Sequence, residues 1–245
     1  FVNASVEEQG IRIADVNGDR LPDIVQGFSN TLQTWINTAN GTWQFNSTWI
    51  LPNTDLAFVN SAGKNKGVRI VDVTGDEMPD IVKQNYTNSS TFVSNATRGY
   101  LLLNVTYDFG GTEQFSYSSS TRFNETGNNS LDTMSFNLWL VTNVTLDNTI
   151  TGSQRQQYSR FYNYSFGKYD ARARQFRGFQ FVQVQNNDTV VKHYFHQDDA
   201  RAGREFATSV HNISSAVYQN TSSDWTVTNT KGYNVTLLVG QRIAS

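Results

Sequence analysis

GIRIADVNGDRLPDIVQ at residues 10–26 and GVRIVDVTGDEMPDIVK at residues 67–83 are two versions of one segment. The two versions lie 57 positions apart, and 11 of their 17 positions are identical. Each version places an acidic loop between two β-branched apolar runs, a pattern that indicates two short strands joined by a polar turn. The chain therefore contains an internal repeat, and its first part is predicted to consist of two copies of one β unit.

The polar turn in each copy has the composition of a calcium-binding loop. Ca²⁺ takes about six to eight oxygen ligands, and alternate side chains of a tight loop can surround one ion. Gly18 and Gly75 allow the positive φ that such a loop needs, and a proline stiffens each exit into the next strand. The predicted ligands are Asp15, Asn17, Asp19 and Asp23 with the Leu21 carbonyl in the first loop, and Asp72, Thr74, Asp76 and Asp80 with the Met78 carbonyl in the second.

We predict two Ca²⁺ sites, of which the first binds more tightly. The second loop has Thr74 where the first has Asn17, and the hydroxyl is a shorter neutral ligand. Three clustered carboxylates repel one another without a cation, so a bound ion should stabilise the fold. The alternative is a set of Asx turns that shapes the loop without metal. Mg²⁺ suits the loops less well, because it requires a tighter octahedron.

The composition excludes several classes of partner. Only 16% of the 245 residues are charged and the net charge is −2, so no field attracts nucleic acid. The chain has no Cys and hence no disulfide. No apolar run approaches the roughly 18 residues of a membrane-spanning helix. Large side chains, including 16 Phe and 11 Tyr, are sufficient for a core.

Asn-x-Ser/Thr sequons indicate an exported glycoprotein with N-linked glycans. The chain has fifteen, whereas its residue frequencies predict roughly five by chance. Strand alternation directs Asn104 and Asn234 away from the apolar face of their strands and toward solvent. We therefore expect an extracellular or cell-surface location, and a chain without an initiator Met or signal peptide is expected to be a mature or trimmed piece. The sequons are at Asn3, Asn40, Asn46, Asn85, Asn88, Asn95, Asn104, Asn124, Asn128, Asn143, Asn163, Asn187, Asn212, Asn220 and Asn234.

The apolar pattern predicts an all-β chain in two regions. Residues 1–98 contain the two calcium-loop repeats, and residues 99–245 contain longer strands. In 179–185 the apolar phase changes, which a β-bulge or burial of both faces would explain. Two units of about 60 residues cannot cover their own open faces, so neighbouring protein is expected. The predicted strands are 11–14, 23–26, 68–71, 80–83, 100–107, 113–117, 136–146, 158–166, 176–185, 189–195 and 233–239.

Polar clusters elsewhere favour structural roles. His193, His196, Asp198 and Asp199 could suggest a zinc site, but residues three apart on a strand face opposite sides. The chain has three His and no Gly-x-Ser-x-Gly, so no nucleophile triad is indicated. A pair of carboxylates for glycoside hydrolysis is not excluded by sequence, although nothing favours one. We therefore predict that the chain is not an enzyme.

Two aromatic or basic clusters have competing interpretations. Arg172, Arg174 and Arg177 could bind phosphate or RNA, but the low net charge and the nearby Asp170 favour internal ion pairs. A set of three tryptophans could stack on sugars, although packing in the core is the more frequent role. These are Trp35, Trp43 and Trp49.

The repeated segment resembles a known repeat family. Asp-x-Asn-Gly-Asp-x-x-Pro-Asp-Ile-Val in the first copy, with Thr for Asn in the second, is similar to the FG-GAP/VCBS repeat of integrin-type propellers and bacterial surface proteins. The resemblance implies that the loop ligands named above bind calcium. Arg20 and Glu77 occupy a position where the family often has Gly, and this departure leaves the loop geometry there open.

The second region resembles the SpvB/TcB-type insecticidal-toxin proteins and their Rhs relatives. The similar segments are GGTEQFSY at 110–117, YNYSFGKYD at 162–170, RQFRGF at 174–179, YFH at 194–196 and GR at 203–204. With the FG-GAP repeats in front, the resemblance extends over roughly residues 10–205. It implies FG-GAP propeller-like repeats leading into a spiralling antiparallel β-sheet shell of Rhs/YD repeats, which encloses a polypeptide cargo, often a toxin.

The chain departs from this family in having no regular YD repeats, no self-cleavage motif and no toxin domain. We therefore expect an extracellular, glycosylated structural protein, a Ca²⁺-stabilised segment of a larger shell that encloses or displays a partner or toxin cargo. Its partners would be the remainder of a longer parent chain or other protein subunits. The alternatives are an integrin-like adhesion or filament-associated module and a secreted carbohydrate-active enzyme.

Overall fold

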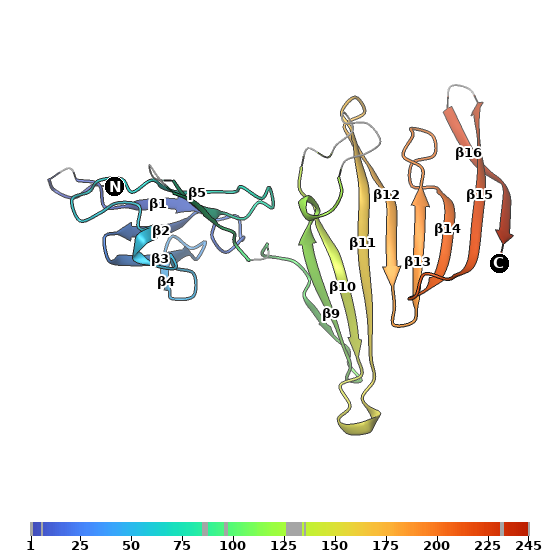
Figure 1. Cartoon of the computed structure of the whole chain (residues 1–245), viewed down its shortest axis with the longest axis horizontal. Helices are drawn as coiled ribbons and strands as arrows, with labels where there is room; N and C mark the ends of the chain where they lie inside the picture. Colours follow the sequence, from blue (N-terminus) through green and yellow to red (C-terminus); the bar gives the residue numbers. More distant parts are fainter. Residues whose placement is uncertain are drawn as a thin grey trace. The chain divides into compact units, whose positions relative to one another are not determined.

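The computed structural model describes residues 2–5, 7–84, 88–95, 98–125, 134, 136–230 and 233–244. Its strands form three sheets in which every neighbouring pair is antiparallel, so the predicted all-β class is confirmed (Figure 1). The chain forms two compact units, Phe1–Leu101 and Leu102–Ser245.

The first unit consists of two small sheets. The first sheet has the order β1 (Ile11–Ala14), β2 (Asp23–Phe28), β3 (Thr31–Asn37) and β4 (Trp43–Asn46). The second has the order β5 (Val68–Val71), β6 (Asp80–Gln84) and β7 (Ser89–Phe92). A single turn of 3₁₀ helix, η1 (Thr54–Leu56), lies between them in the chain.

The two sheets repeat the same register. Ile24 pairs with Ile13 on one side and with Trp35 on the other. Residues 57 positions later pair in the same way, because Ile81 pairs with Ile70 and with Phe92. The sequence repeat is therefore also a repeat of strand pairing, and a residue of one sheet can be compared directly with its counterpart in the other.

The core of the first unit contains residues from both repeats. Val25, Val68 and Ile81 belong to one buried cluster with Leu51 and Phe58 of the connecting segment. Gly27 lies close to this segment, and a Cβ there would come within 2.7 Å of the Leu51 side chain. Burial of these apolar side chains is the main source of stability for a unit whose strands are only four to seven residues long.

The second unit contains one nine-stranded sheet in which every strand pairs with its neighbour in sequence (Figure 1). Two 3₁₀ turns, η2 (Ser120–Arg122) and η3 (Gly152–Gln154), interrupt the meander. The strands are β8 (Asn104–Thr106), β9 (Thr112–Ser119), β10 (Trp139–Asp147), β11 (Gln157–Asp170), β12 (Gln175–Gln185), β13 (Thr189–Phe195), β14 (Glu205–Asn212), β15 (Val217–Thr230) and β16 (Tyr233–Ala244).

The predicted strand at 100–107 is too long, because β8 covers only Asn104–Thr106. The Leu103 carbonyl still accepts the Phe115 amide, but a turn follows at once in which the Gly110 amide donates to the Tyr107 carbonyl. β14 and β15 were not predicted. β15 reads VYQNTSSDWTVTNT, in which Asn, Ser and Thr hide the apolar alternation.

The apolar phase change in 179–185 results from burial of both faces. Residues 179–184 are all half-buried, and the pairing of β12 with β13 is regular from Phe181 to Gln185. The β-bulge lies just before this stretch, where Gly167 pairs with Phe179 and Tyr169 pairs with Phe176. Both sides of this strand are therefore partly covered, and the bulge precedes the phase change.

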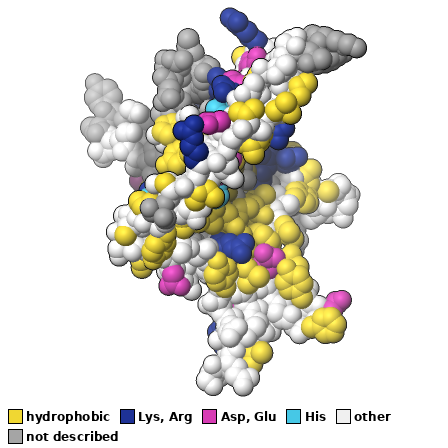
Figure 2. Space-filling view, turned by 90° about the vertical axis from the view of Figure 1, so that its right-hand side faces the viewer, with side chains coloured by type: hydrophobic (Ala, Val, Ile, Leu, Met, Phe, Trp, Pro, Cys, Tyr) yellow, Lys and Arg dark blue, Asp and Glu magenta, His cyan; other side chains and the backbone are white. Residues whose placement is uncertain are grey.

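Apolar side chains are exposed along the last strand. Val235, Leu237 and Val239, which share the predicted apolar face, are 42%, 54% and 62% exposed. Figure 2 shows apolar side chains over the visible face, with single charged side chains between them. No helix within the described parts of the chain is long and apolar enough to span a bilayer.

Candidate metal centres

The first predicted loop joins β1 to β2 and is closed by its own side chains. Asp15 accepts hydrogen bonds from the backbone amides of Gly18 at 2.8 Å and Arg20 at 2.7 Å. Asn17 accepts from the Asp19 amide at 3.0 Å, and Asp19 accepts from the Leu21 amide at 2.8 Å. The chain curls because alternate side chains bond to amides ahead of them, which is the Asx-turn mechanism.

Asp23 differs from the other carboxylates of the first loop because its side chain is fully buried. It accepts amide hydrogen bonds from Val16 and from Asn37, both at 2.9 Å. Burial raises the pKa of Asp23 above 3.8, the two amides oppose this, and the neighbouring charges of Asp19 and Asp15 add to the increase. A cation at this loop would lower that electrostatic cost.

The second loop, between β5 and β6, repeats this arrangement. Asp72 accepts from the amides of Gly75 at 2.7 Å and Glu77 at 2.8 Å. The Thr74 hydroxyl lies 3.4 Å from Asp72 and 3.3 Å from Asp80, so it donates toward the carboxylates. Asn17 instead donates through its amide nitrogen to Asp19 and keeps its oxygen as an acceptor. Which of the two loops binds Ca²⁺ more tightly stays a prediction.

Four positions of the two loops have left-handed backbone conformation. Gly18 and Gly75 have φ values of 77° and 72°, as predicted. Arg20 and Glu77, where the family often has Gly, have φ values of 69° and 66°. Both residues therefore adopt the left-handed conformation that Gly favours, at a conformational cost of about 1–2 kcal/mol at each of them. Glu77 also forms an ion pair with Arg98.

The donor chemistry of the loops fits Ca²⁺, because every predicted ligand offers oxygen. The predicted ligands are nevertheless not clustered closely enough to form a metal site. Over the described ranges, no group of three or more His, Asp or Glu side chains is close enough to hold a metal ion. Calcium binding by the ten predicted ligands therefore stays a prediction.

The link between each last loop aspartate and a distant amide was missed by the sequence reasoning. Asp23 bonds to Asn37 and Asp80 bonds to Ser94, in both cases 14 residues further along the chain. The equal spacing in the two repeats is a signal that could have indicated it. Asn37 is the last residue of β3, and Ser94 lies two residues after the end of β7.

The sequon asparagines are mostly accessible. Asn104 and Asn234 are exposed, but so are Leu103 and Leu237 on the opposite faces of their strands, so alternation does not distinguish the two faces there. Of the thirteen within the described residues, ten are exposed and Asn46, Asn143 and Asn212 are half-buried. The predicted sites at Asn85 and Asn128 lie outside the described residues.

The histidine-rich segment does not form a metal site in the described structure. His193 lies 2.6 Å from Glu205 on the neighbouring strand. His196 instead packs on Phe206, with ring centroids 4.8 Å apart, and burial lowers the pKa of His196 below 6.5. The two His rings therefore have separate partners, as expected for residues three apart near the end of a strand.

The arginine cluster contains an internal ion-pair network, as predicted from the nearby Asp170. The Arg177 side chain is 7% exposed and donates to Asp170 at 3.1 Å and to Asp199. Arg172 and Arg174 lie in the exposed turn between β11 and β12. The Arg177 guanidinium is thus paired with two carboxylates and is not available to bind phosphate.

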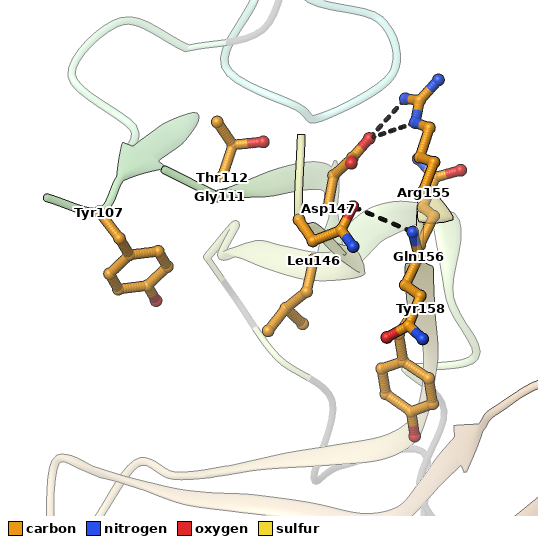
Figure 3. A pocket seen from close by; sticks show the side chains of 10 residues that line it. Tyr107, Gly111, Thr112, Leu146, Asp147, Arg155, Gln156 and Tyr158 are labelled. Atoms are coloured by element: carbon orange, nitrogen blue, oxygen red, sulfur yellow. Dashed lines mark hydrogen bonds and ion pairs between the residues drawn. The ribbon is translucent and has the colours of Figure 1, made fainter. Parts of the chain in front are cut away.

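A depression of about 680 Å³ lies at one end of β9, β10 and β11. Figure 3 shows Asp147 facing Arg155 across an ion pair, with Tyr158 pointing away from both. The Arg155 guanidinium lowers the pKa of Asp147 below 3.8, so this carboxylate is ionised at neutral pH and is a poor general acid. The depression contributes no catalytic arrangement.

Two family models match the chain. The insecticide toxin TcdB middle/N-terminal region matches residues 57–203, and an FG-GAP-like repeat matches residues 15–82. Both resemblances predicted from the motifs are confirmed by these matches. No curated protein matches the chain.

Solved structures with the same fold come from toxin complexes. The chain in the crystal structure of TcdB2-TccC3 shares 14% identity over 96% of this chain, with a TM-score of 0.67. A mutant of the Photorhabdus luminescens Tc holotoxin pore shares 13% identity over 96% of this chain, with a TM-score of 0.66. The chain spans only 15% and 14% of the length of these two proteins. At such identities the likeness shows the fold.

Proposed function

Because the chain belongs to the family of the insecticide toxin TcdB middle/N-terminal region, we propose that it is a structural segment of a larger toxin-complex shell and not an enzyme. The observation that supports this most directly is the nine-stranded antiparallel meander that follows the FG-GAP-like sheets, because 96% of this chain, meander included, superposes on a chain of TcdB2-TccC3 with a TM-score of 0.67. Its proposed role is to enclose or display a polypeptide cargo.

The exposed edge strand of the nine-stranded sheet supports the proposal that neighbouring protein covers it. Among the described strands, β16 pairs only with β15, although it is twelve residues long. Leu237 and Leu238, which point to opposite faces, are 54% and 50% exposed. A long apolar edge strand promotes uncontrolled pairing unless protein covers it. The proposed cover is further β-structure of a longer parent chain or another subunit.

Calcium is proposed as a stabilising ligand of the first unit. The side chains of the two loops would hold it, and the ion would offset the mutual repulsion of the carboxylates. The raised pKa of the buried Asp23 supports a cation at the first loop. The second loop would bind more weakly, since the Thr74 hydroxyl donates to the carboxylates beside it.

N-linked glycans are proposed on the exposed sequons, which would place the protein outside the cell. Asn104, Asn163 and Asn220 are exposed and lie on one face of the nine-stranded sheet, because they occupy matching positions in the register of β8 to β15. Glycans there would keep that face in solvent.

The shell role is tested on the protein at its natural length, purified from its source. Electron microscopy of single particles should show a hollow shell, and limited proteolysis should leave any enclosed polypeptide intact until the shell is opened. A particle without an internal cavity, or a filament of repeating subunits, would contradict the proposed shell. The filament would favour the adhesion alternative.

A further inference from the structure

The chain contains two Asn-Gly pairs, Asn17–Gly18 in the first acidic loop and Asn40–Gly41 in the turn between β3 and β4. In such a pair the backbone nitrogen of the glycine can attack the side-chain carbonyl carbon of the asparagine, because glycine has no side chain to hinder the approach. Both pairs have the same reacting groups, so their surroundings in the fold decide which of them reacts.

The fold holds the reacting atoms of the first pair in place. The Gly18 amide donates to Asp15 at 2.8 Å, and the side-chain nitrogen of Asn17 donates to Asp19 at 2.9 Å. Gly18 is also crowded, because a Cβ there would lie 3.0 Å from the Arg98 Cα. The attacking nitrogen and the nitrogen that would leave are thus both bound to carboxylates, which opposes the backbone movement that ring closure requires.

The second pair is open. Asn40 and Gly41 are both exposed, and a Cβ at Gly41 would meet nothing within 4 Å. Within the described part of the chain, neither the Gly41 amide nor the side-chain nitrogen of Asn40 forms a hydrogen bond. Both nitrogens are therefore free to move when the glycine nitrogen approaches the asparagine side chain.

The side-chain carbonyl of Asn40 is surrounded by donors. The Thr38 and Thr42 hydroxyls lie 2.5 Å and 2.6 Å from Asn40 Oδ1, and the Thr42 amide donates to the same oxygen at 3.1 Å. Attack on the carbonyl carbon places negative charge on this oxygen, and donors that are already in position stabilise such a charge. The turn therefore combines a free nucleophile with an activated carbonyl.

We propose that Asn40 is a site of spontaneous modification, which converts it to aspartate and isoaspartate, whereas the fold preserves Asn17. The Gly41 nitrogen loses its proton and bonds to Asn40 Cγ, the bond from Cγ to Nδ2 breaks, and the leaving nitrogen takes up a proton and departs as ammonia. The product is a cyclic imide, and water opens it at either carbonyl. The reaction consumes one water molecule and needs no oxidant, metal or cofactor.

This modification excludes a glycan at the same residue. The Asn40 side-chain nitrogen would receive the glycan of the sequon, and the reaction removes that nitrogen as ammonia. Each conversion also adds one negative charge to a chain whose net charge is −2. Only this consequence rests on the proposed glycosylation, because the reaction itself requires neither glycans nor a shell.

The test uses the full chain, produced in a host that attaches no N-linked glycans and incubated in EDTA at mildly alkaline pH. Peptide mapping by mass spectrometry follows the conversion of both asparagines with time, and circular dichroism verifies that the chain stays folded. We expect Asn40 to convert at least about tenfold faster than Asn17. In urea, where both pairs lose their surroundings, the two rates should become similar. Equal rates in the folded chain, or a preference for Asn40 that is unchanged in urea, would overturn the proposal.

Two substitutions at Thr42 test the activated carbonyl. Thr42→Val removes the hydroxyl at nearly constant size and should slow the conversion of Asn40 by about tenfold, a smaller effect than at a buried oxyanion site because the turn is exposed. Thr42→Ser keeps a hydroxyl and should react as the parent does, and in urea the two variants should react alike. Parental rates in both folded variants would refute the role of the hydroxyl. None of these outcomes bears on the shell role, which is judged on the particle formed by the natural protein.

Discussion

Asp80 and Ser94 are joined by a 2.8 Å hydrogen bond from the Ser94 amide to the Asp80 carboxylate, across 14 positions of the chain. Asp23 and Asn37 form the equivalent bond in the first repeat at 2.9 Å. Both aspartates are essentially inaccessible to solvent. The last acidic residue of each loop therefore holds the chain at or just after the end of the third strand, as well as the loop itself.

Asp80→Ala should destabilise the first unit, because the substitution removes the acceptor of the Ser94 and Val73 amides at a buried position. We expect a loss of about 2–4 kcal/mol in the free energy of unfolding. Urea denaturation followed by the fluorescence of Trp35, Trp43 and Trp49 measures it. Asp55→Ala is the control, since the Asp55 side chain is exposed and its pairing with Lys83 is screened by solvent and should contribute little to stability. Equal losses would contradict the buried role of Asp80.

Calcium should raise the stability of the first unit. At a Ca²⁺ concentration of a hundred times the Kd, binding adds about 2.7 kcal/mol. Titration calorimetry should detect two sites, with Asp19→Asn weakening the tighter one and Asp76→Asn the weaker one. A melting temperature that is the same in EDTA and in excess Ca²⁺, with no heat of binding, would exclude both sites.

The buried Asp23 gives the calcium-free protein a defined response to pH. The pKa of Asp23 is raised in the folded state, so its favourable contribution is fully present below pH 3.8 and is lost as pH rises through the higher folded-state pKa. We expect the stabilisation by Ca²⁺ to grow over this same window. Urea denaturation at a series of pH values, with Ca²⁺ and with EDTA, measures the difference. A difference that is constant with pH would show that Asp23 does not take part.

The second unit should show the opposite pH dependence at Asp170. The Ala173 amide, assisted by Arg177, lowers the pKa of Asp170 below 3.8. The stabilisation by this group is therefore complete above pH 3.8 and is lost as pH falls through the folded-state pKa. Asp170→Asn should lower the free energy of unfolding at pH 7 and reduce its further decrease on acidification. Unfolding is followed by Trp139 and Trp225 fluorescence. The control is Asp188→Asn in the exposed β12–β13 turn. If both variants lose stability equally on acidification, the pH dependence does not come from Asp170.

Gly18 is required both for its backbone conformation and for space. Its φ is 77°, and a Cβ would lie 3.0 Å from the Arg98 Cα and 3.1 Å from the Met78 sulfur. Gly18→Ala should cost about 2–4 kcal/mol, whereas Gly41→Ala, at φ 84° with open space, should cost about 1 kcal/mol. Thermal unfolding of the two variants compares them directly. Equal costs would mean that the loop moves away from Arg98 without penalty.

The sequence predicts those elements whose ends are fixed by local chemistry. The strands at 11–14 and 68–71 were predicted with their observed bounds, because the acidic loop ends each of them. The loop curl and the positive φ of Gly18 and Gly75 follow from the same residues. These features depend on contacts between residues close in sequence.

Features that depend on distant partners were not predictable in this way. β14 and β15 are held by their neighbours in the sheet, and the polar sequence of β15 alone favours turns. The bond from Asp80 to Ser94 joins the loop to a residue 14 positions away, and only a comparison of the two repeats gives a signal for it. The alternate spacing places the carboxylates in one loop, but it does not specify where their oxygens point. In the described structure, no three of them are close enough together to hold a metal ion.

Glycan occupancy should differ between two sequons on the same face of the nine-stranded sheet. Asn163 is exposed, whereas Asn143 is half-buried and its side-chain oxygen is buried without a hydrogen-bond partner in the described structure. The amide nitrogen of Asn143, which would receive the glycan, donates to the Thr145 hydroxyl at 3.2 Å, and Thr145 is itself 8% exposed.

We therefore expect Asn163 to be modified and Asn143 to stay unmodified when the chain is secreted from a glycosylating host. Glycopeptide mass spectrometry gives the occupancy at each site, and Asn163→Gln should remove one glycan from the intact mass, whereas Asn143→Gln should remove none. Modification of Asn143 during synthesis, before the sheet closes, would reverse this order. It would show that accessibility in the folded sheet does not control the attachment of glycans to this chain.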